Sequence, residues 1–181
     1  THAAGTVVRS LAGDSEGKMI TGKPVTGVAL DRGQARIDLH TVPDKPGVAA
    51  RVFGALAAKG VSVDMIVQGV RGAGDSRQQM AFIVKRELVP EALEALAPVL
   101  ESMGATAAVD EDVAKLTVVG IAIGSTPGVA ARLFEAVASV GANIEAITSS
   151  EVRLSVLIPA EHAEAALAAA HAAFGLDAEA S

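Results

Sequence analysis

The stretch PGVAARVFGALAAKG, residues 46–60, occurs a second time as PGVAARLFEAVASVG at residues 127–141, which is 81 positions later (127 minus 46). The same offset relates the residues on either side of the two copies, and no gap is needed. It pairs Asp44 with Ser125, Ser62 with Asn143, Asp64 with Glu145 and Gln68 with Ser149. An ungapped repeat of this length indicates a duplicated structural unit.

Each copy has the pattern of an amphipathic helix. Proline suits a first helical position, because its missing N–H would have no partner there. Apolar residues then recur at helical spacing, as at Val48, Val52 and Leu56 of the first copy. Gly60 follows as a stop signal. We therefore predict a helix of about four turns in each copy, with Pro46 as its first residue in the first copy.

Composition limits the class of protein. The 181 residues are 50% hydrophobic, which is enough for a sizeable core, but only 2% aromatic, so the core must be built from Val, Ile, Leu and Ala. The net charge of −6 disfavours a nucleic-acid or anionic-membrane surface. Without cysteine there are no disulfides, thiolate zinc sites or thiol catalysis. No signal-peptide pattern and no apolar run of about 18 residues is present, so we expect a cytoplasmic location.

The segments around the two repeats alternate between strand-like and helix-like patterns. Residues 61–70, VSVDMIVQGV, are expected to form a strand with Val61 and Met65 on one face and Asp64 and Gln68 on the other. The expected strands are residues 24–30, 35–39, 61–70, 79–85, 106–109, 115–123, 143–148 and 152–158, the further helices are residues 90–103 and 161–174, and residues 71–76 form a turn. The first unit therefore reads β-α-β-β-α-β.

The second unit is one strand short at its C-terminal end. Residues 24–30, PVTGVAL, are left over at the front of the chain and are the candidate to complete it, which makes the second domain discontinuous. The expected domains are residues 34–112 and residues 24–33 plus 113–176, with a linker or tail of an upstream catalytic part at residues 1–23 and a tail at residues 177–181. The start at Thr1 instead of Met suggests a fragment or a processed product.

Several segments resemble one protein family in their amino-acid sequence and in their order along the chain. They are PVTGVALDRGQARI, PDKPGVAARVFGALA, VSVDMIVQ, VDEDVAKLTVVG, PGVAARLFEA, ANIEAITSSEVRLSVLI and ALAAAHAAFGL. Together they resemble the paired ACT domains of bacterial aspartate kinases, and above all the regulatory (beta) subunit, over residues 23–176. The resemblance implies an α+β fold of two tandem ferredoxin-like βαββαβ domains, with antiparallel sheets, helices on one face, and an N-terminal strand that completes the second domain.

Three positions depart from the family pattern. The family usually has Gln-Asn where this chain has Gln68-Gly69, and His where it has Thr126. It has Ser-Thr-Ser-Glu where this chain reads TSSE at residues 148–151. The change at Gly69 removes a side chain beside an implied ligand contact.

Asp44 allows two interpretations. A carboxylate in the turn before a helix can cap backbone N–H groups. Alternatively, the helix-start amides take the carboxylate of a zwitterionic ligand while Asp44 takes its ammonium or hydroxyl group. The family resemblance favours the second interpretation.

The other polar residues of the repeat also allow two interpretations. Asp64 and Gln68 lie on a solvated strand face, or they contact a small ligand if another ACT unit covers that face. Asn143 and Ser150 are turn residues, or they contribute to the ligand site from the second unit. The effector contacts that the resemblance implies are Asp44, Lys45, Gly47, Val48, Ala49, Ser62, Val63, Asp64, Gln68, Asn143, Ile144, Ser149 and Ser150.

No catalytic constellation or cofactor motif is present. The sequence lacks a G-x-x-x-x-G-K-[ST] phosphate loop and a G-x-G-x-x-G motif, and its four histidines show no metal-ligand spacing. A ferredoxin-like acylphosphatase would need an Arg-Asn phosphate site, and no such pair appears in the sequence. An RNA-binding sheet would need aromatic residues, which make up only 2% of this chain. We expect a non-enzymatic regulatory subunit that binds threonine, lysine or both, forms a homodimer through strands such as residues 61–67 and 154–158, and acts on an aspartate kinase catalytic chain. The alternative is an ACT pair that serves another amino-acid enzyme, such as acetolactate synthase.

Overall fold

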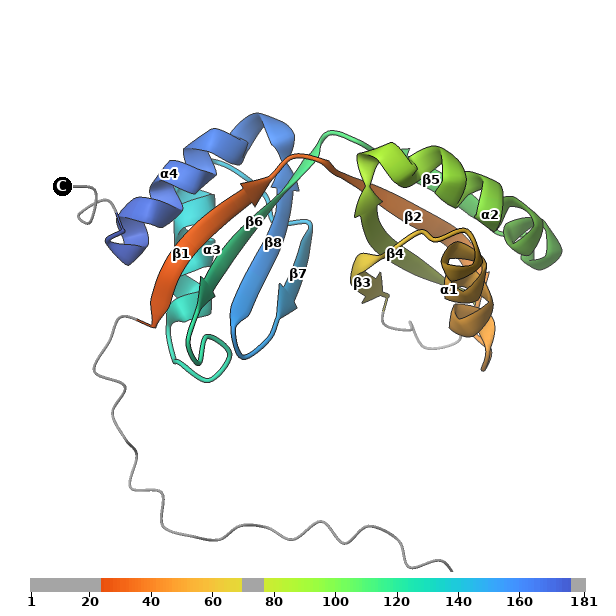
Figure 1. Ribbon diagram of the computed structural model, residues 1–181, viewed down its shortest axis with the longest axis horizontal. Coiled ribbons are helices and arrows are strands. Elements are labelled where there is room, and N and C mark those ends of the chain that lie inside the picture. The colour runs from red at the N-terminus through yellow and green to blue at the C-terminus, as the bar shows by residue number, and fades with distance from the viewer. Residues whose placement is uncertain (1–23, 70–76, 177–181) are drawn as a thin grey trace, which may run out of the picture.

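The computed structural model describes residues 24–69 and 77–176, so the expectations for residues 1–23, 71–76 and 177–181 lie outside the described part. The chain forms two α+β units, each with a four-stranded antiparallel sheet and two helices on one face (Figure 1). The elements are β1 (Val25–Asp31), β2 (Gln34–Pro43), α1 (Val48–Ala58), β3 (Asp64–Gln68), β4 (Arg77–Lys85), α2 (Val89–Met103), β5 (Thr106–Asp110), β6 (Val113–Gly120), α3 (Val129–Ser139), β7 (Ala146–Ser149), β8 (Arg153–Pro159) and α4 (Ala163–Phe174). Single 3-10 turns, Arg86–Leu88 and Ala160–His162, lead into α2 and α4.

The two sheets have the same strand order. The first runs β3-β4-β2-β5 and the second β1-β6-β8-β7, so β1 fills in the second sheet the place that β5 fills in the first. Each pair of neighbouring strands is antiparallel. The predicted fold class, including a second unit completed by an N-terminal strand, is confirmed. The residue boundaries of the two domains stay a prediction.

The repeated helices begin later than predicted. Gly47 is the N-cap of α1 at φ 89°, and Gly128 is the N-cap of α3 at the same φ. This left-handed conformation suits glycine, which has no Cβ, and it places Pro46 before the helix instead of inside it. Each helix has 11 residues, or about three turns, so the prediction of four turns from Pro46 is wrong.

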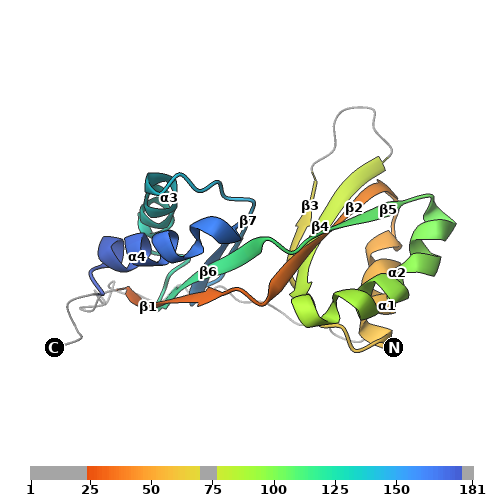
Figure 2. The same cartoon turned by 90° about the horizontal axis from the view of Figure 1, so that it is seen from above.

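Each unit has its own aliphatic core between its sheet and its two helices. Ile37, Leu56 and Phe82 are fully buried in the first core, and Leu116 and Leu133 in the second. A third, smaller cluster joins the units, because the uncovered face of the first sheet turns toward the second unit (Figure 2). It consists of Met65, Ile83, Val113, Ala146 and Leu157.

The edge strand β3 carries a bulge at Met65, whose φ is 41°, and the pairing with β4 shifts register there. The extra residue turns the following side chains to the opposite face. Asp64 therefore lies opposite Ile83 on the uncovered face, whereas Gln68 lies opposite the core residue Met80. The sequence analysis expected a regular strand from residue 61, but the observed strand begins at Asp64 and is interrupted by this bulge.

Candidate functional site

The first group of implied contact residues lies where β2 passes into α1. The N-cap Gly47 has no side chain to bond the first-turn amides. The N–H of Val48 donates to the carbonyl of Lys45 at 3.3 Å, which closes the turn. Asp44 is half-buried and stands three residues ahead of the N-cap, so it is not the N-cap residue of α1. A carboxylate such as that of Asp44 can bind the ammonium group of an amino acid, and the amides of the adjacent helix start can bind its carboxylate.

Gln68 lies at the same end of the first sheet. Across β4, Gln78 pairs with Val42 of β2 and Met80 pairs with Gln68 of β3, so Gln68 is close to the strand end from which α1 departs. Its Nε2 donates to Oε1 of Gln78 at 2.8 Å. Because Gln68 is on the helix-covered side, it belongs with the α1 start.

Ser62, Val63 and Asp64 lie at the opposite end of β3 from Gln68. Ser62 is exposed, and Val63 packs against the first core. The prediction that Asp64 and Gln68 share one strand face is wrong, because the bulge at Met65 separates their orientations. Within one chain, the implied contacts of the first unit therefore form two separate groups, one at the α1 start with Gln68 and one at residues 62–64.

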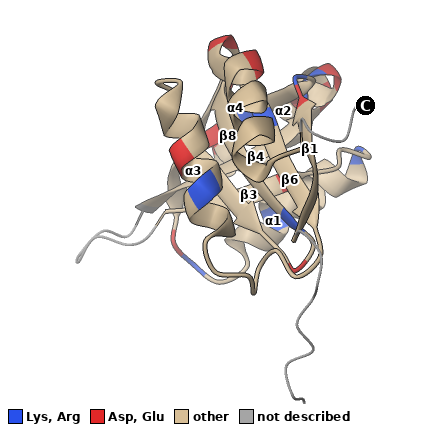
Figure 3. Cartoon of the chain, turned by 90° about the vertical axis from the view of Figure 1, so that its left-hand side faces the viewer, with Lys and Arg blue, Asp and Glu red and all other residues tan. Residues whose placement is uncertain are grey.

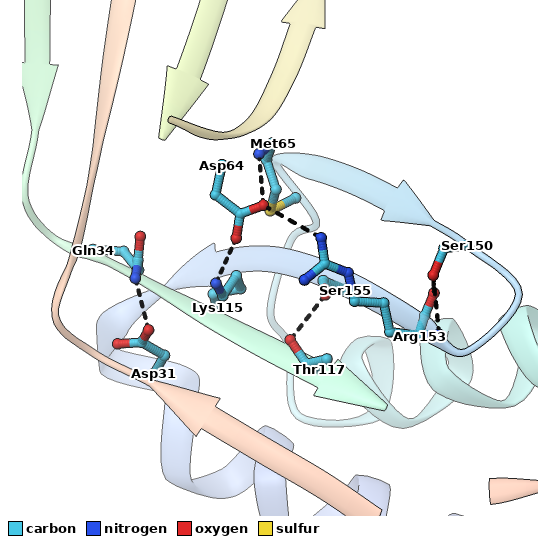
Figure 4. Close-up of polar contacts among 9 residues, drawn as sticks. All are labelled: Asp31, Gln34, Asp64, Met65, Lys115, Thr117, Ser150, Arg153 and Ser155. Atoms are coloured by element: carbon cyan, nitrogen blue, oxygen red, sulfur yellow. Dashed lines mark hydrogen bonds and ion pairs between the residues drawn. The ribbon is translucent and has the colours of Figure 1, made fainter. Parts of the chain in front are cut away.

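The side chain of Asp64 contacts the second unit (Figure 4). Its Oδ2 accepts a hydrogen bond from Nζ of Lys115 at 2.7 Å, and its Oδ1 lies 3.8 Å from a guanidinium nitrogen of Arg153. Oδ1 also accepts from the N–H of Met65 at 3.0 Å. Burial alone would raise the pKa of Asp64, but these hydrogen bonds and charges, those of Lys115 first, leave its pKa below the usual value.

The implied residues of the second unit flank β7. Asn143 is exposed and Ile144 packs against the second core, both in the loop before the strand. Ser149 ends β7 and is exposed. The hydroxyl of Ser150 lies 3.3 Å from the carbonyl of Arg153 and accepts from its N–H at 3.2 Å, which is the turn role that the sequence left open.

Arg36 is a functional candidate that the sequence analysis missed. Its guanidinium donates to Asp38 at 2.8 Å and to Asp110 at 3.3 Å, and it also bonds Glu145 of the second unit. Burial would lower the pKa of Arg36, but Asp38 first, then Glu145 and Asp110, raise it. The pKa of Glu145 is raised, because burial and the neighbouring Asp110 and Asp38 outweigh the attraction of Arg36. In the sequence, Arg36 and Asp38 alternate with apolar residues of the expected strand 35–39, but nothing in that pattern identifies Glu145 as a partner.

A small open cavity of about 210 Å³ lies at this contact between the units. Arg36, Asp38, His40 and Glu145 contribute polar groups to its wall, and Val67 is part of its apolar lining. The three carboxylates around Arg36 outnumber the cation that they share. The cavity therefore belongs to the contact between the units and is distinct from the group at the α1 start.

Charges of both signs are interspersed on the face that α3 and α4 present (Figure 3). Among residues 24–69 and 77–176, no helix has the length and apolar character to cross a membrane. The same residues contain no cluster of three or more His, Cys, Asp or Glu side chains that would hold a metal ion.

Comparison with known proteins assigns both units. Residues 37–101 and residues 116–174 each match the ACT domain family. A curated aspartokinase of Thermus thermophilus is 56% identical over 177 residues, which are 98% of this chain and 42% of that protein. The chain thus spans less than half the length of that relative.

Two solved structures show the same fold over most of this chain. The regulatory subunit of aspartate kinase from Thermus thermophilus, in a ligand free form, is 60% identical with a TM-score of 0.81, and the match covers 84% of this chain and 99% of that one. A structure of aspartokinase alpha and beta subunits gives 40% identity and a TM-score of 0.76, covering 83% of this chain and 99% of that one. The match to the first structure extends over nearly its full length.

Proposed function

This chain belongs to the aspartate kinase family as its regulatory, ACT-domain part, and from that membership we propose that it binds threonine, lysine or both and passes feedback inhibition to a catalytic chain. The 181 residues cover only the regulatory part of the full-length relative, and the catalytic half has no counterpart in them. The chain is accordingly a regulator and not itself the kinase.

The observation that carries the proposal is the grouping of Asp44, the α1 start and Gln68 at one end of the first sheet. The carboxylate of an amino acid fits the helix-start amides of Gly47 and Ala49, which flank the Val48 amide bonded to Lys45, and its ammonium fits Asp44. The side-chain amide of Gln68 then contacts the side chain of the effector. Lys45, which is exposed in the same turn, adds a positive charge near the effector carboxylate.

A second copy of the chain completes this site. β3 and β7 each lie at one edge of their sheet, and each presents an exposed isoleucine at the same repeat position, Ile66 at 56% and Ile147 at 49% exposure. Antiparallel pairing of β3 with β7 of a second copy brings Asn143 and Ile144 of that copy beside Gln68. The same pairing brings Ser149 and Ser150 beside Ser62 and Val63, which forms a second, related site.

One expected part of the dimer interface is wrong. Residues 154–158 belong to β8, an inner strand whose side chains are fully or almost fully buried within the chain. They are therefore not available to a second copy. The exposed edge strands β3 and β7 take that role in the proposal.

The catalytic chain is the proposed receiver of the signal. The alpha and beta subunit structure contains a chain that matches this one, which supports the same association here. An effector that binds better to one packing of the sheets shifts the population toward that packing, and a catalytic chain that senses the packing is inhibited. We place this activity in the cytoplasm.

The alternative that the sequence left open is an ACT pair serving another enzyme, such as acetolactate synthase. The ACT family match alone fits both assignments. The relative and the structures described above are aspartate kinases, and they favour the first assignment.

Calorimetry with threonine and lysine, separately and mixed, tests the proposal together with sedimentation at matched concentrations. A ligand that binds only the dimer stabilises it by about 2.7 kcal/mol at a hundredfold excess over its Kd. We expect heat of binding for at least one amino acid and a tighter dimer in its presence. Absence of binding with both amino acids, or a dimer constant that ignores them, would contradict the proposal.

A further inference from the structure

Two ion pairs between the units use equivalent acidic residues of the two copies of the repeat. Asp64, just ahead of the β3 bulge, binds Lys115 of β6, and Glu145, just ahead of β7, binds Arg36 of β2. Asp64 and Glu145 are 81 positions apart (145 minus 64), the offset of the repeat. Each unit therefore holds the other through the acidic residue that precedes or begins its edge strand.

Of the two cations that contact Asp64, Lys115 is better shielded from solvent than Arg153. The side chain of Lys115 is 15% exposed and that of Asp64 33%, whereas Arg153 is 51% exposed. The contact borders the apolar cluster that includes Met65 and Leu157. An ion pair seated on an apolar contact fixes position better than one in open solvent, because neighbouring side chains limit its movement.

The strand β3 connects this ion pair to the proposed effector site. Gln68, at one end of β3, belongs to the α1 start, and Asp64, at the other end, faces the second unit. The strand is only five residues long, and within one chain its hydrogen-bonded neighbour is β4. In the proposed dimer, β7 of the second copy lies on its other side, so a shift of Gln68 that accompanies effector binding at that interface is passed along this short strand to Asp64.

We propose that Asp64 is a positioning residue, which, through Lys115 and Arg153, couples effector occupancy at the Gln68 end of β3 to the relative placement of the two units. This inference rests on the proposed effector binding and replaces the role of Asp64 as a direct ligand contact. It separates two properties: Gln68 determines affinity, and the Asp64 ion pair determines whether binding moves the units.

Pulsed electron paramagnetic resonance measures the movement. The chain has no cysteine, so E91C on α2 and E135C on α3 introduce one spin label in each unit at exposed positions. We expect threonine or lysine to shift the distance distribution of the labelled parent chain. In a K115M or D64N background that shift is lost, while calorimetry gives a Kd within about fivefold of the parent, as for a partly exposed ion pair. In a separate variant, K115R, the positive charge is kept, and the shift should be retained.

A matched control is K59M, which removes the Lys59–Glu94 pair of 2.7 Å within the first unit. It keeps both the affinity and the shift if the effect of Lys115 is specific. A D64N chain that loses affinity by tenfold or more, or that retains the shift, overturns the inference. If the parent chain binds neither amino acid, the proposed function fails. The label distances of K115M and the parent without ligand then test the ion pair alone, and identical distributions would overturn its positioning role.

Discussion

The two copies of the duplicated unit share a backbone but surround it with different chemistry. α1 and α3 begin at glycines with nearly the same conformation, φ 89° and ψ −11° for Gly47 and φ 89° and ψ −12° for Gly128. Around these starts, the first unit has Asp44 and Gln68 where the second has two serines. The two helix starts therefore offer different polar groups: a carboxylate and an amide in the first unit, and hydroxyl groups in the second, where the hydroxyl of Ser125 donates to a carboxylate oxygen of Glu151 at 3.3 Å. Duplication supplies the scaffold, and under the proposed function these substitutions favour the first copy as the ligand site.

The copies also differ in how their sheets are completed. The first sheet takes its fourth strand, β5, from the same stretch of chain, but the second takes β1 from ahead of the first unit. The chain consequently crosses between the units twice, at Arg32–Gly33 and at Glu111–Asp112. Two adjacent crossings restrict relative movement more than one linker would, which is consistent with the proposed coupling between the units.

The largest expected effect comes from removing β1. Val25, Val28 and Leu30 contribute to the second core, and burying side chains of this kind stabilises by about 1.5–3 kcal/mol each. Deleting residues 1–31 should lower the free energy of unfolding of the second unit by about 3 kcal/mol or more relative to deleting residues 1–23. Hydrogen exchange should show lost protection in β6 and β8 while β2 and β4 keep theirs. Equal exchange in the two truncations would mean that β1 is not needed.

The next effect concerns affinity and separates the two helix starts. D44A and Q68A should each weaken effector binding about tenfold or more, because each removes a hydrogen bond to a charged or polar ligand group. S125A, the change in the second unit that matches D44A, should leave calorimetric affinity within about twofold. Thermal melts provide the control that all three variants remain folded. If S125A loses as much affinity as D44A, the two helix starts are functionally equivalent.

The sequence was sufficient for the parts of this comparison that depend on local pattern. The repeat located both helices, and the missing strand of the second unit pointed to residues 24–30 as its substitute. The bulge at Met65 was not predictable, because VSVDMIVQ alternates as a regular strand does and the extra residue shows only in its pairing with β4. The Arg36–Glu145 pair was hidden for a different reason, since its members are 109 positions apart and belong to different units.

A smaller effect tests whether the two helix starts are structurally equal. Alanine at Gly47 or Gly128 would meet no atom within 4 Å, so its cost comes from the left-handed backbone alone. G47A and G128A should each lower the free energy of unfolding by about 1 kcal/mol. Urea denaturation of the two variants should give similar losses. A clearly larger loss in one would show that its surrounding loop holds the helix start more rigidly.

The smallest effect concerns pH and distinguishes the two equivalent acidic residues, whose pKa values shift in opposite directions. Asp64 has its pKa lowered, so its contribution to stability is present above about pH 3.9 and is lost as the pH falls through its folded pKa. Glu145 has its pKa raised, so its charged form costs stability above the folded pKa, and that cost disappears as the pH falls toward about 4.3.

The difference follows from charge balance, because Asp64 faces two cations whereas Glu145 shares Arg36 with Asp38 and Asp110. At pH 7, D64N should therefore lower the free energy of unfolding by up to about 1 kcal/mol, whereas E145Q, which removes a charge that costs stability, should leave it unchanged or raise it slightly. As the pH falls from 7 toward about 4.3, the parent chain should gain stability relative to E145Q, and the deficit of D64N should persist until the pH falls below about 4. Urea denaturation at these pH values measures both trends. Parallel pH profiles for the parent and E145Q would mean that the crowding of carboxylates around Arg36 has no energetic consequence.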